Sequence, residues 1–453
     1  MFRSFFPFSA KDLAFLIPLW ALGIFVQVRG IGHLGYVGQD FNYHHDILLS
    51  YPAGYRFSLT NPPGLYWLGQ LIRHLVGPAQ GLPALALTFV ALNALALGVL
   101  YGLLWQSVAL PPLRWAAAAL VTLVPFRLVQ SVVFAADAFT IPIFILTACF
   151  SLRLFHDPRR ILPWVGLCLT LCVGMVCKYT VIGLLPAIAL LLGSAIFRQV
   201  SGPARWKWAA LGGFALAAPA AIFCLETGEG GGLHSHWLAP GEPAVMRWSD
   251  ILLLKKNDRA VFSAPEYYRD EVYDYRKFSY AGLLHLSALT DCQSFFQPPP
   301  ADFDRAAFTR APYEFRHVRS PRSQWLQSWS VRWSLPFSLL AVLGTVACAV
   351  LTGIALFRPV PLLSSGLMVL TLLALGFYAP IFLNLHRVGD PYTAGYWVAR
   401  LVMPALLVFY LLGFVLVDLA CRRFASPAAA RRIALGVAGY TFVGCALFVS
   451  FLV

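Results

Sequence analysis

The sequence contains few charged residues. Only 12% of its 453 residues are Asp, Glu, Lys or Arg, whereas 59% are hydrophobic, and the mean hydropathy is +0.70. A soluble globular domain has about one quarter charged residues and could not bury this much apolar surface. We therefore expect a protein that is surrounded largely by lipid.

Acidic residues are especially scarce, with 20 Asp and Glu against 34 Lys and Arg. A net charge of +14 is also typical of nucleic-acid-binding proteins. The distribution of the basic residues along the chain distinguishes that class from a membrane protein. A disulfide framework is not expected, because eight of the nine cysteines lie in apolar stretches and only Cys292 lies in a polar loop.

Long apolar runs dominate the chain. A transmembrane helix needs about 17–25 mostly apolar residues. About eleven stretches meet this requirement: 12–28, 83–107, 114–134, 138–155, 161–177, 179–197, 207–225, 334–357, 361–384, 396–418 and 432–452. The sequence thus predicts an all-α polytopic membrane protein, and we interpret the first run as a retained span rather than a cleaved signal peptide.

The basic residues indicate how the spans are oriented. If the N-terminus is cytoplasmic, the short inner connections all carry Lys or Arg, which is the positive-inside pattern. These residues are Arg3, Lys11, Arg114, Arg153, Arg159, Arg160, Arg198, Arg205, Lys207, Arg358, Arg422, Arg423, Arg431 and Arg432. The surplus charge therefore reflects topology and predicts membrane lipids, not nucleic acid, as the partner.

Two long loops, 29–82 and 226–333, then fall on the outer face. The second contains 13 basic and 13 acidic residues and is rich in Tyr, Trp and Pro, which favours a small ordered subdomain. We expect three units: an N-terminal transmembrane module (1–225) that includes loop 29–82, the outer-face subdomain (226–333), and a C-terminal transmembrane module (334–453).

The acidic residues outside the second loop number seven, and they divide by side. Three lie beside basic residues at the predicted cytoplasmic edges: Asp12, Asp157 and Asp418. Four face outward: Asp40, Asp46, Asp137 and Asp390. Acids near hydrocarbon are costly and tend to mark functional sites, so we expect the chemistry on the outer, periplasmic or lumenal, face.

The segment from Gln39 to Asp46 follows the first span and contains Asp40, His44, His45 and Asp46. Two acids and two histidines can supply a general base, a pair of metal ligands, or both. In a helix, Asp40 and His44 would share one face. The alternative is a solvated polar loop.

A restrained turn follows at Asn61-Pro-Pro-Gly-Leu-Tyr66. Two prolines and a glycine define a sharp backbone path, and Tyr66 suits the headgroup region. The apolar residues 62–76 are too short to span, so we expect a re-entrant or interface-lying helix. The alternative is a simple connection.

Asp137 lies between two predicted spans with almost no loop. We expect it to face a polar cavity or to pair with Arg127 or another outward cation, and a helix cap is the alternative. The outward cations Lys178, Arg387 and Arg400 could bind the phosphate of a lipid substrate. Snorkelling to the interface is the other interpretation of these cations.

These features resemble the GT-C superfamily of integral-membrane glycosyltransferases, which use polyprenyl- or dolichyl-phosphate-linked sugars. The segment Asn61–Tyr66 is similar to motifs of the dolichyl-phosphate-glucose glucosyltransferases and, more loosely, of the aminoarabinose and protein mannosyltransferases. Asp40 and Asp137 match the two acidic positions of the superfamily. Tyr396–Pro404 is similar to a late Arg-containing motif, with the order of the aromatic residue and Arg400 altered.

The resemblance implies a GT-C-like bundle and an inverting transfer from a polyprenyl-phosphate-sugar donor to a lipid or glycan acceptor. It implies that Asp40 is the base, that Asp137 and His44 assist, and that the substrate-binding residues are His45, Asp46, Asn61, Tyr66, Lys178, Arg387 and Arg400. A divalent cation such as Mg²⁺ or Mn²⁺ would take Asp40, His44 and Asp137 as ligands. Whether the protein requires this cation is open, because Phe41 follows Asp40 where several members of the superfamily have a second acid.

Three alternatives remain from the sequence. A transporter or lipid flippase explains the spans but not the acids on one face. An O-antigen ligase or polymerase, which uses a diphosphate-linked glycan, is compatible with the Arg316-His-Val-Arg319 segment of the second loop. The third alternative is a non-catalytic scaffold of the same fold.

Overall fold

The computed structural model describes residues 8–31, 48–49, 63–132, 135–228, 279–290, 321–358, 364–385 and 398–453. These residues form helices and contain no strand. Eight helical stretches among them are long and apolar enough to cross a membrane: Ala10–Ile31, Gly81–Ser107, Ala136–His156, Tyr179–Gln199, Ala204–Leu225, Trp325–Phe357, Val402–Phe424 and Pro427–Leu452. The all-α polytopic membrane prediction is confirmed.

Three of the eleven predicted spans are not among these eight stretches. The 161–177 stretch is the 17-residue helix α8 (Ile161–Cys177), and the 361–384 stretch is α17 (Ser365–Leu385), of which Ser365–Pro380 counts as a shorter apolar helix. The 114–134 stretch is divided into α5 (Pro111–Leu123) and α6 (Pro125–Gln130). The number eleven therefore stays a prediction.

The break between α5 and α6 follows from Pro125, which has no N–H to donate and restricts the residue before it. Val124 accordingly leaves the helical region, with ψ at 120°. The buried side chain of Arg127 spans the break: its Nε donates to the carbonyl of Thr122 at 2.9 Å, and its Nη2 donates to the same oxygen. A carbonyl that the break releases is thus paired inside the bundle.

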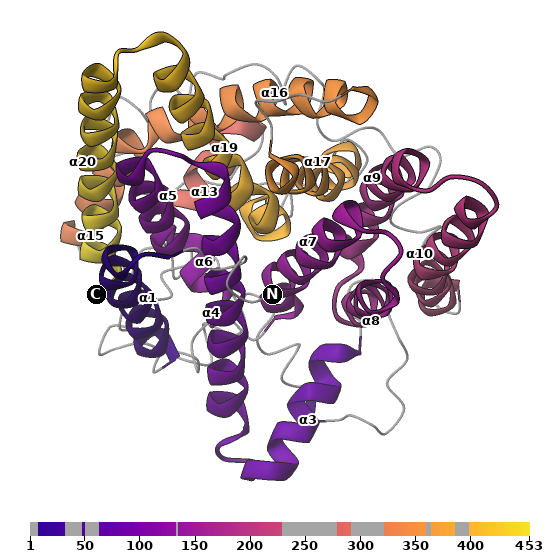
Figure 1. Cartoon of the computed structure of the whole chain (residues 1–453). Helices are drawn as coiled ribbons and strands as arrows, with labels where there is room; N and C mark the ends of the chain where they lie inside the picture. Colours follow the sequence, from indigo (N-terminus) through magenta and orange to yellow (C-terminus); the bar gives the residue numbers. More distant parts are fainter. Residues whose placement is uncertain are drawn as a thin grey trace.

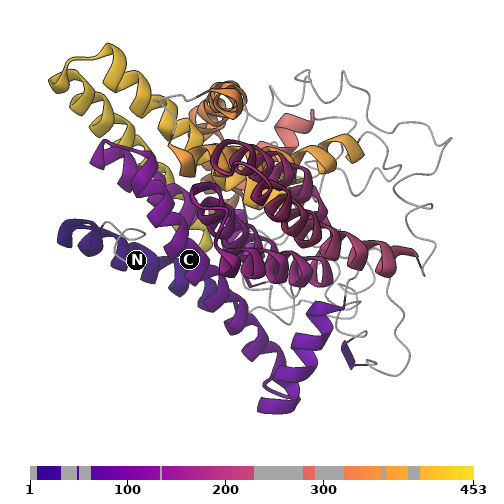
Figure 2. The same ribbon diagram turned by 45° about the vertical axis from the view of Figure 1, so that its right-hand side comes forward.

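Two helices form a hairpin at one end of the bundle. Both views show α3 (Gly64–Val76) meeting the start of α4 (Gly81–Ser107) at the lower end of the molecule (Figures 1 and 2). The positive φ of 86° at Gly77 ends α3 and turns the chain toward α4. The short helix expected over 62–76 is present, whereas its placement relative to a bilayer stays a prediction.

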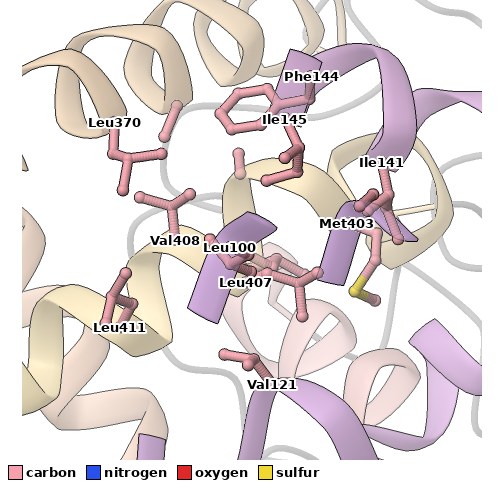
Figure 3. Close-up of a cluster of buried hydrophobic side chains, with 14 of the residues drawn as sticks. Leu100, Val121, Ile141, Phe144, Ile145, Leu370, Met403, Leu407, Val408 and Leu411 are labelled. Carbon is pink, nitrogen blue, oxygen red and sulfur yellow. The ribbon is translucent and has the colours of Figure 1, made fainter. Parts of the chain in front are cut away.

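The core lies among α4, α5, α7 (Thr140–His156), α17 and α19 (Val398–Phe424). Figure 3 shows side chains from these five helices in contact around Leu100, Val121, Phe144, Leu370 and Leu407. Each of these five side chains is at most 2% exposed. In contrast, α10 (Ala204–Gly228) lies at the edge in Figure 1 and has few buried residues, as expected for a lipid-facing helix.

The remaining helices complete the bundle. They are α1 (Ala10–Ile31), α9 (Leu184–Gln199), α13 (Tyr280–Leu289), α15 (Pro321–Trp333), α16 (Leu335–Phe357) and α20 (Pro427–Leu452). The helices α13 and α15 belong to residues 226–333, for which the sequence predicted a small ordered subdomain.

The connections that were predicted to be cytoplasmic contact each other. Arg198 Nη2 donates to the Ala355 carbonyl at 2.9 Å, and Arg159 Nη2 donates to the Gln199 carbonyl at 3.2 Å. The buried Asp418 accepts from the Leu110 amide at 2.8 Å. Since α7 and α8 run in opposite directions from this end, Asp137 before α7 and Lys178 after α8 both lie at the other end.

Candidate functional site

Two helical breaks place Asp137 and Lys178 side by side. Asp137 lies in the single 3-10 turn η3 (Ala136–Phe139), which leads directly into α7. Lys178 has an extended backbone, with φ −160° and ψ 118°, between α8 and the 3-10 turn η4 (Tyr179–Gly183). Each residue is thus at the end of a helix, where its side chain can turn into the bundle.

The two side chains form a buried ion pair. Lys178 Nζ lies 2.9 Å from Asp137 Oδ1, and the side chains are 12% and 2% exposed. Of the two partners considered for Asp137, the structure therefore has the other outward cation and not Arg127. Each charge compensates the other, because a lone ion in an apolar bundle is strongly disfavoured.

The start of α3 lies next to Lys178. A Cβ atom added to Gly64 would lie 2.7 Å from Cys177 Sγ and 2.9 Å from the Val176 carbonyl oxygen, so only glycine permits this approach. Pro63 and Tyr66 are buried at the same junction. The restrained turn predicted around Pro63 thus lies against the end of α8, immediately before the lysine.

The second turn of α19 lies close to the first turn of α7. Figure 3 shows Met403 beside Ile141, and Ile141 follows Asp137 by four residues. Arg400 is the third residue of α19, so its backbone lies near the same end of the bundle. Its side chain lies outside the described residues.

Neutral polar side chains that the sequence analysis did not select surround η3. Gln130 Nε2 donates to the Asp137 carbonyl at 2.8 Å and to Thr140 Oγ1 at 3.0 Å. Thr140 Oγ1 donates to the Asp137 carbonyl at 2.7 Å, and Asn93 Nδ2 donates to the Ala138 carbonyl at 3.1 Å. An amide within an apolar span is the signal that could have identified Gln130 and Asn93.

Six predicted site residues lie outside the described residues: Asp40, His44, His45, Asp46, Asn61 and Arg387. Among the residues that the structure describes, no three His, Cys, Asp or Glu side chains gather as a metal site would require. Because Asp40 and His44 are not among them, their predicted roles as base and metal ligands stay predictions.

Comparisons with known proteins agree with the resemblance seen in the sequence. Residues 60–223 match the family described as dolichyl-phosphate-mannose-protein mannosyltransferase. This segment contains η3, Asp137, Lys178 and the start of α3. A search of curated proteins found no match.

Solved structures similar to the chain include that of ArnT from Cupriavidus metallidurans bound to undecaprenyl phosphate, with 14% identity and a TM-score of 0.36. Another is ArnT from the same organism in the apo state, with 12% identity and a TM-score of 0.33. Each match covers 94% of this chain and 85% of the other. At this low similarity, the solved structures carry no argument about this chain. Over residues 60–223 of its 453, the chain is similar to the dolichyl-phosphate-mannose-protein mannosyltransferase family.

Proposed function

We propose that the protein transfers a sugar from a polyprenyl-phosphate-linked donor to a lipid or glycan acceptor on the periplasmic or lumenal side of a membrane. The observation that carries this proposal is the buried Lys178–Asp137 pair at one end of the bundle, within the segment that matches the mannosyltransferase family. A bundle stabilised by apolar packing alone does not need two buried charges, which indicates a role in binding or chemistry.

Among the three predicted phosphate-binding cations, Lys178 is the one whose side chain the structure describes, and it can bind the phosphate of the donor. Its ammonium is already partly desolvated, so an anionic oxygen that replaces or shares Asp137 would interact strongly with it. The nearby N-terminal end of α3 adds a partial positive charge, because the first peptide N–H groups of a helix point outward. Arg400, in the first turn of α19, and Arg387 are the further candidates.

The proposed reaction is a single displacement. Asp40, with help from His44, removes the proton of an acceptor hydroxyl, and the hydroxyl oxygen bonds to the anomeric carbon of the sugar. The bond from that carbon to the phosphate oxygen breaks, and the lipid phosphate leaves with the electron pair. Attack from the opposite side inverts the anomeric centre. A positioned base supplies about 10²–10⁴-fold in rate, and the cations stabilise the charge of the leaving phosphate.

The other predicted residues are assigned to the substrates. His45, Asp46, Asn61 and Tyr66 would line the site near the sugar and the acceptor, and loops 29–82 and 226–333 would cover it. The proposed units are 1–225, 226–333 and 334–453, with a cytoplasmic N-terminus. The basic connections at the opposite end of the bundle support this orientation.

A divalent cation is compatible with the proposal. Mg²⁺ or Mn²⁺ would take oxygen and nitrogen ligands from Asp40, Asp137 and His44 and would neutralise part of the phosphate charge. Lys178 already provides a positive charge 2.9 Å from Asp137 Oδ1, which weakens the attraction of that carboxylate for a second cation.

The proposal is tested with purified protein and a panel of undecaprenyl-phosphate-linked glucose, mannose and aminoarabinose, together with membrane lipid extract as acceptor. We expect release of undecaprenyl phosphate from at least one donor, and loss of that release in Asp40→Asn at normal expression. Activity only with a diphosphate-linked glycan would instead indicate a ligase. Transbilayer movement of the donor without bond cleavage would indicate a flippase.

A further inference from the structure

We propose that Gln130 and Thr140 are positioning residues, which hold the η3 turn so that Asp137 meets Lys178 and Lys178 can bind a lipid phosphate. The proposal rests on the proposed function of the Lys178–Asp137 pair. It assigns a role to two neutral side chains that are not among the predicted site residues.

The η3 turn cannot hold its own geometry. It has four residues, and the residue before it, Ala135, is extended, with φ −149° and ψ 151°. A single turn of helix is marginal in isolation because it fixes several dihedral angles for few hydrogen bonds. The direction of the Asp137 side chain therefore depends on what other elements do to the backbone of η3.

Gln130 and Thr140 act on that backbone together. The amide nitrogen of Gln130 donates to the Asp137 carbonyl at 2.8 Å and to the Thr140 hydroxyl at 3.0 Å. The same hydroxyl donates to the Asp137 carbonyl at 2.7 Å. Three groups from α6, η3 and α7 thus form a closed hydrogen-bonded triangle, and the residues are between 1% and 3% exposed.

Asn93, on α4, forms a hydrogen bond with the next peptide group of η3, that of Ala138. Its amide nitrogen donates to the Ala138 carbonyl at 3.1 Å and to the Phe89 carbonyl of α4 at 2.9 Å. Consecutive carbonyls, those of Asp137 and Ala138, are therefore fixed by different helices. Two fixed peptide planes restrict the Cα–Cβ direction of Asp137, and hence the position of the ammonium that its carboxylate binds.

This arrangement goes beyond pairing buried polar groups. The backbone amide of Thr140 already donates to the Asp137 carbonyl, as in an ordinary turn, and two side chains converge on this same carbonyl in addition. A displacement of about 1 Å at a reacting or binding group costs about 10²-fold in rate. Loosening η3 should therefore affect phosphate binding and catalysis more than it affects the fold.

The chain offers a well-matched control. Thr140 and Thr147 both lie on α7, are 1% and 0% exposed, and can be changed to Val with almost the same shape. The hydroxyl of Thr147 makes no hydrogen bond within the described part of the chain, whereas that of Thr140 bonds to the Asp137 carbonyl. The two substitutions thus remove the same atom from the same helix and differ in the contact to η3.

The experiment measures the affinity of the purified, detergent-solubilised full chain for undecaprenyl phosphate, the thermal midpoint of unfolding, and kcat and KM for the donor that the panel identifies. We expect Thr140→Val to weaken undecaprenyl phosphate binding about tenfold and Gln130→Met about 10²-fold, with kcat falling in parallel. Thr147→Val should match the wild type in affinity and in kcat. Asn93→Leu removes the hydrogen bond to the Ala138 carbonyl and should also weaken undecaprenyl phosphate binding.

The proposal is overturned if folded Thr140→Val and Gln130→Met bind undecaprenyl phosphate as the wild type does, or if Thr147→Val loses as much affinity as Thr140→Val. A failure of the proposed function looks different. In that case the wild type and Lys178→Met would bind undecaprenyl phosphate equally weakly, and no variant of η3 could change that value.

Discussion

Lys178 and Asp137 form an ion pair across 2.9 Å although one follows α8 and the other precedes α7. Both side chains are largely buried, and each compensates the charge of the other. Removing one partner of a buried pair leaves an uncompensated ion and destabilises a protein by about 3–5 kcal/mol, whereas removing both is much less damaging.

This relationship predicts a strong coupling in stability. Asp137→Asn and Lys178→Met should each lower the thermal midpoint of the purified protein, and the double variant should recover much of the loss. The measurement is thermal unfolding in detergent for the wild type, both single variants and the double variant. Additive losses in the double variant would mean that the pair contributes no coupling.

The close contact between α3 and α8 predicts that a substitution at Gly64, which lies outside the ion pair, lowers the transfer activity. Gly64→Ala would place a Cβ atom 2.7 Å from Cys177 Sγ, so the start of α3 would have to move away from Lys178. We expect transfer activity to fall by about tenfold or more, because small displacements at a site are costly.

Gly98→Ala on α4 is the control for Gly64→Ala, since nothing lies within 4 Å of a Cβ atom at that position. It should leave the activity unchanged and slightly favour the helix, as alanine does relative to glycine. Equal activities of the two variants would show that the start of α3 does not depend on close contact with α8.

His285 on α13 predicts a dependence of stability on pH. Burial lowers the pKa of this histidine from 6.5 to about 4, although the hydrogen bond between its Nε2 and the Val331 carbonyl opposes the shift. Its Nδ1 pairs with Ser338 Oγ at 2.6 Å. The unfolded state binds the proton more readily, so stability is complete above pH 6.5 and falls as the pH decreases toward 4.

The size of this loss is on the order of 2–3 kcal/mol between pH 7 and pH 4. It can be measured as the decrease in the thermal midpoint over that range for the wild type and for His285→Asn. The variant should be less stable at pH 7 but should vary less with pH. An identical pH profile in both proteins would exclude His285 as the source.

Much of the helical architecture could be predicted from the sequence, because span length and apolar composition are set by the bilayer itself. The break at Val124 was missed, since Pro125 lies in an uninterrupted apolar run and its effect depends on Arg127 pairing the released carbonyl of Thr122. Prolines within α1 and α10 did not divide those helices. A proline in a span therefore does not by itself identify a break.

The site was predictable only in part. Asp137 and Lys178 could be selected because charges are rare in apolar segments, but their pairing could not, since it depends on how α7 and α8 end at the same side. Gln130, Thr140 and Asn93 were not selected. An amide within an apolar span could have pointed to Gln130 and Asn93, but their convergence with Thr140 on η3 depends on the fold. Asp40 and His44 remain predictions from the sequence.

The central claim is that Lys178 serves transfer from a polyprenyl-phosphate-linked sugar. The most direct measurement is the rate of undecaprenyl phosphate release from the donor panel by the wild type, Lys178→Met and Lys207→Met, each corrected for folded protein. Lys207 lies at the start of α10, in a connection predicted to be cytoplasmic, so its substitution removes the same charge at the other end of the bundle. We predict a loss of about 10²-fold or more in Lys178→Met and none in Lys207→Met. Equal rates in all three proteins would contradict the account.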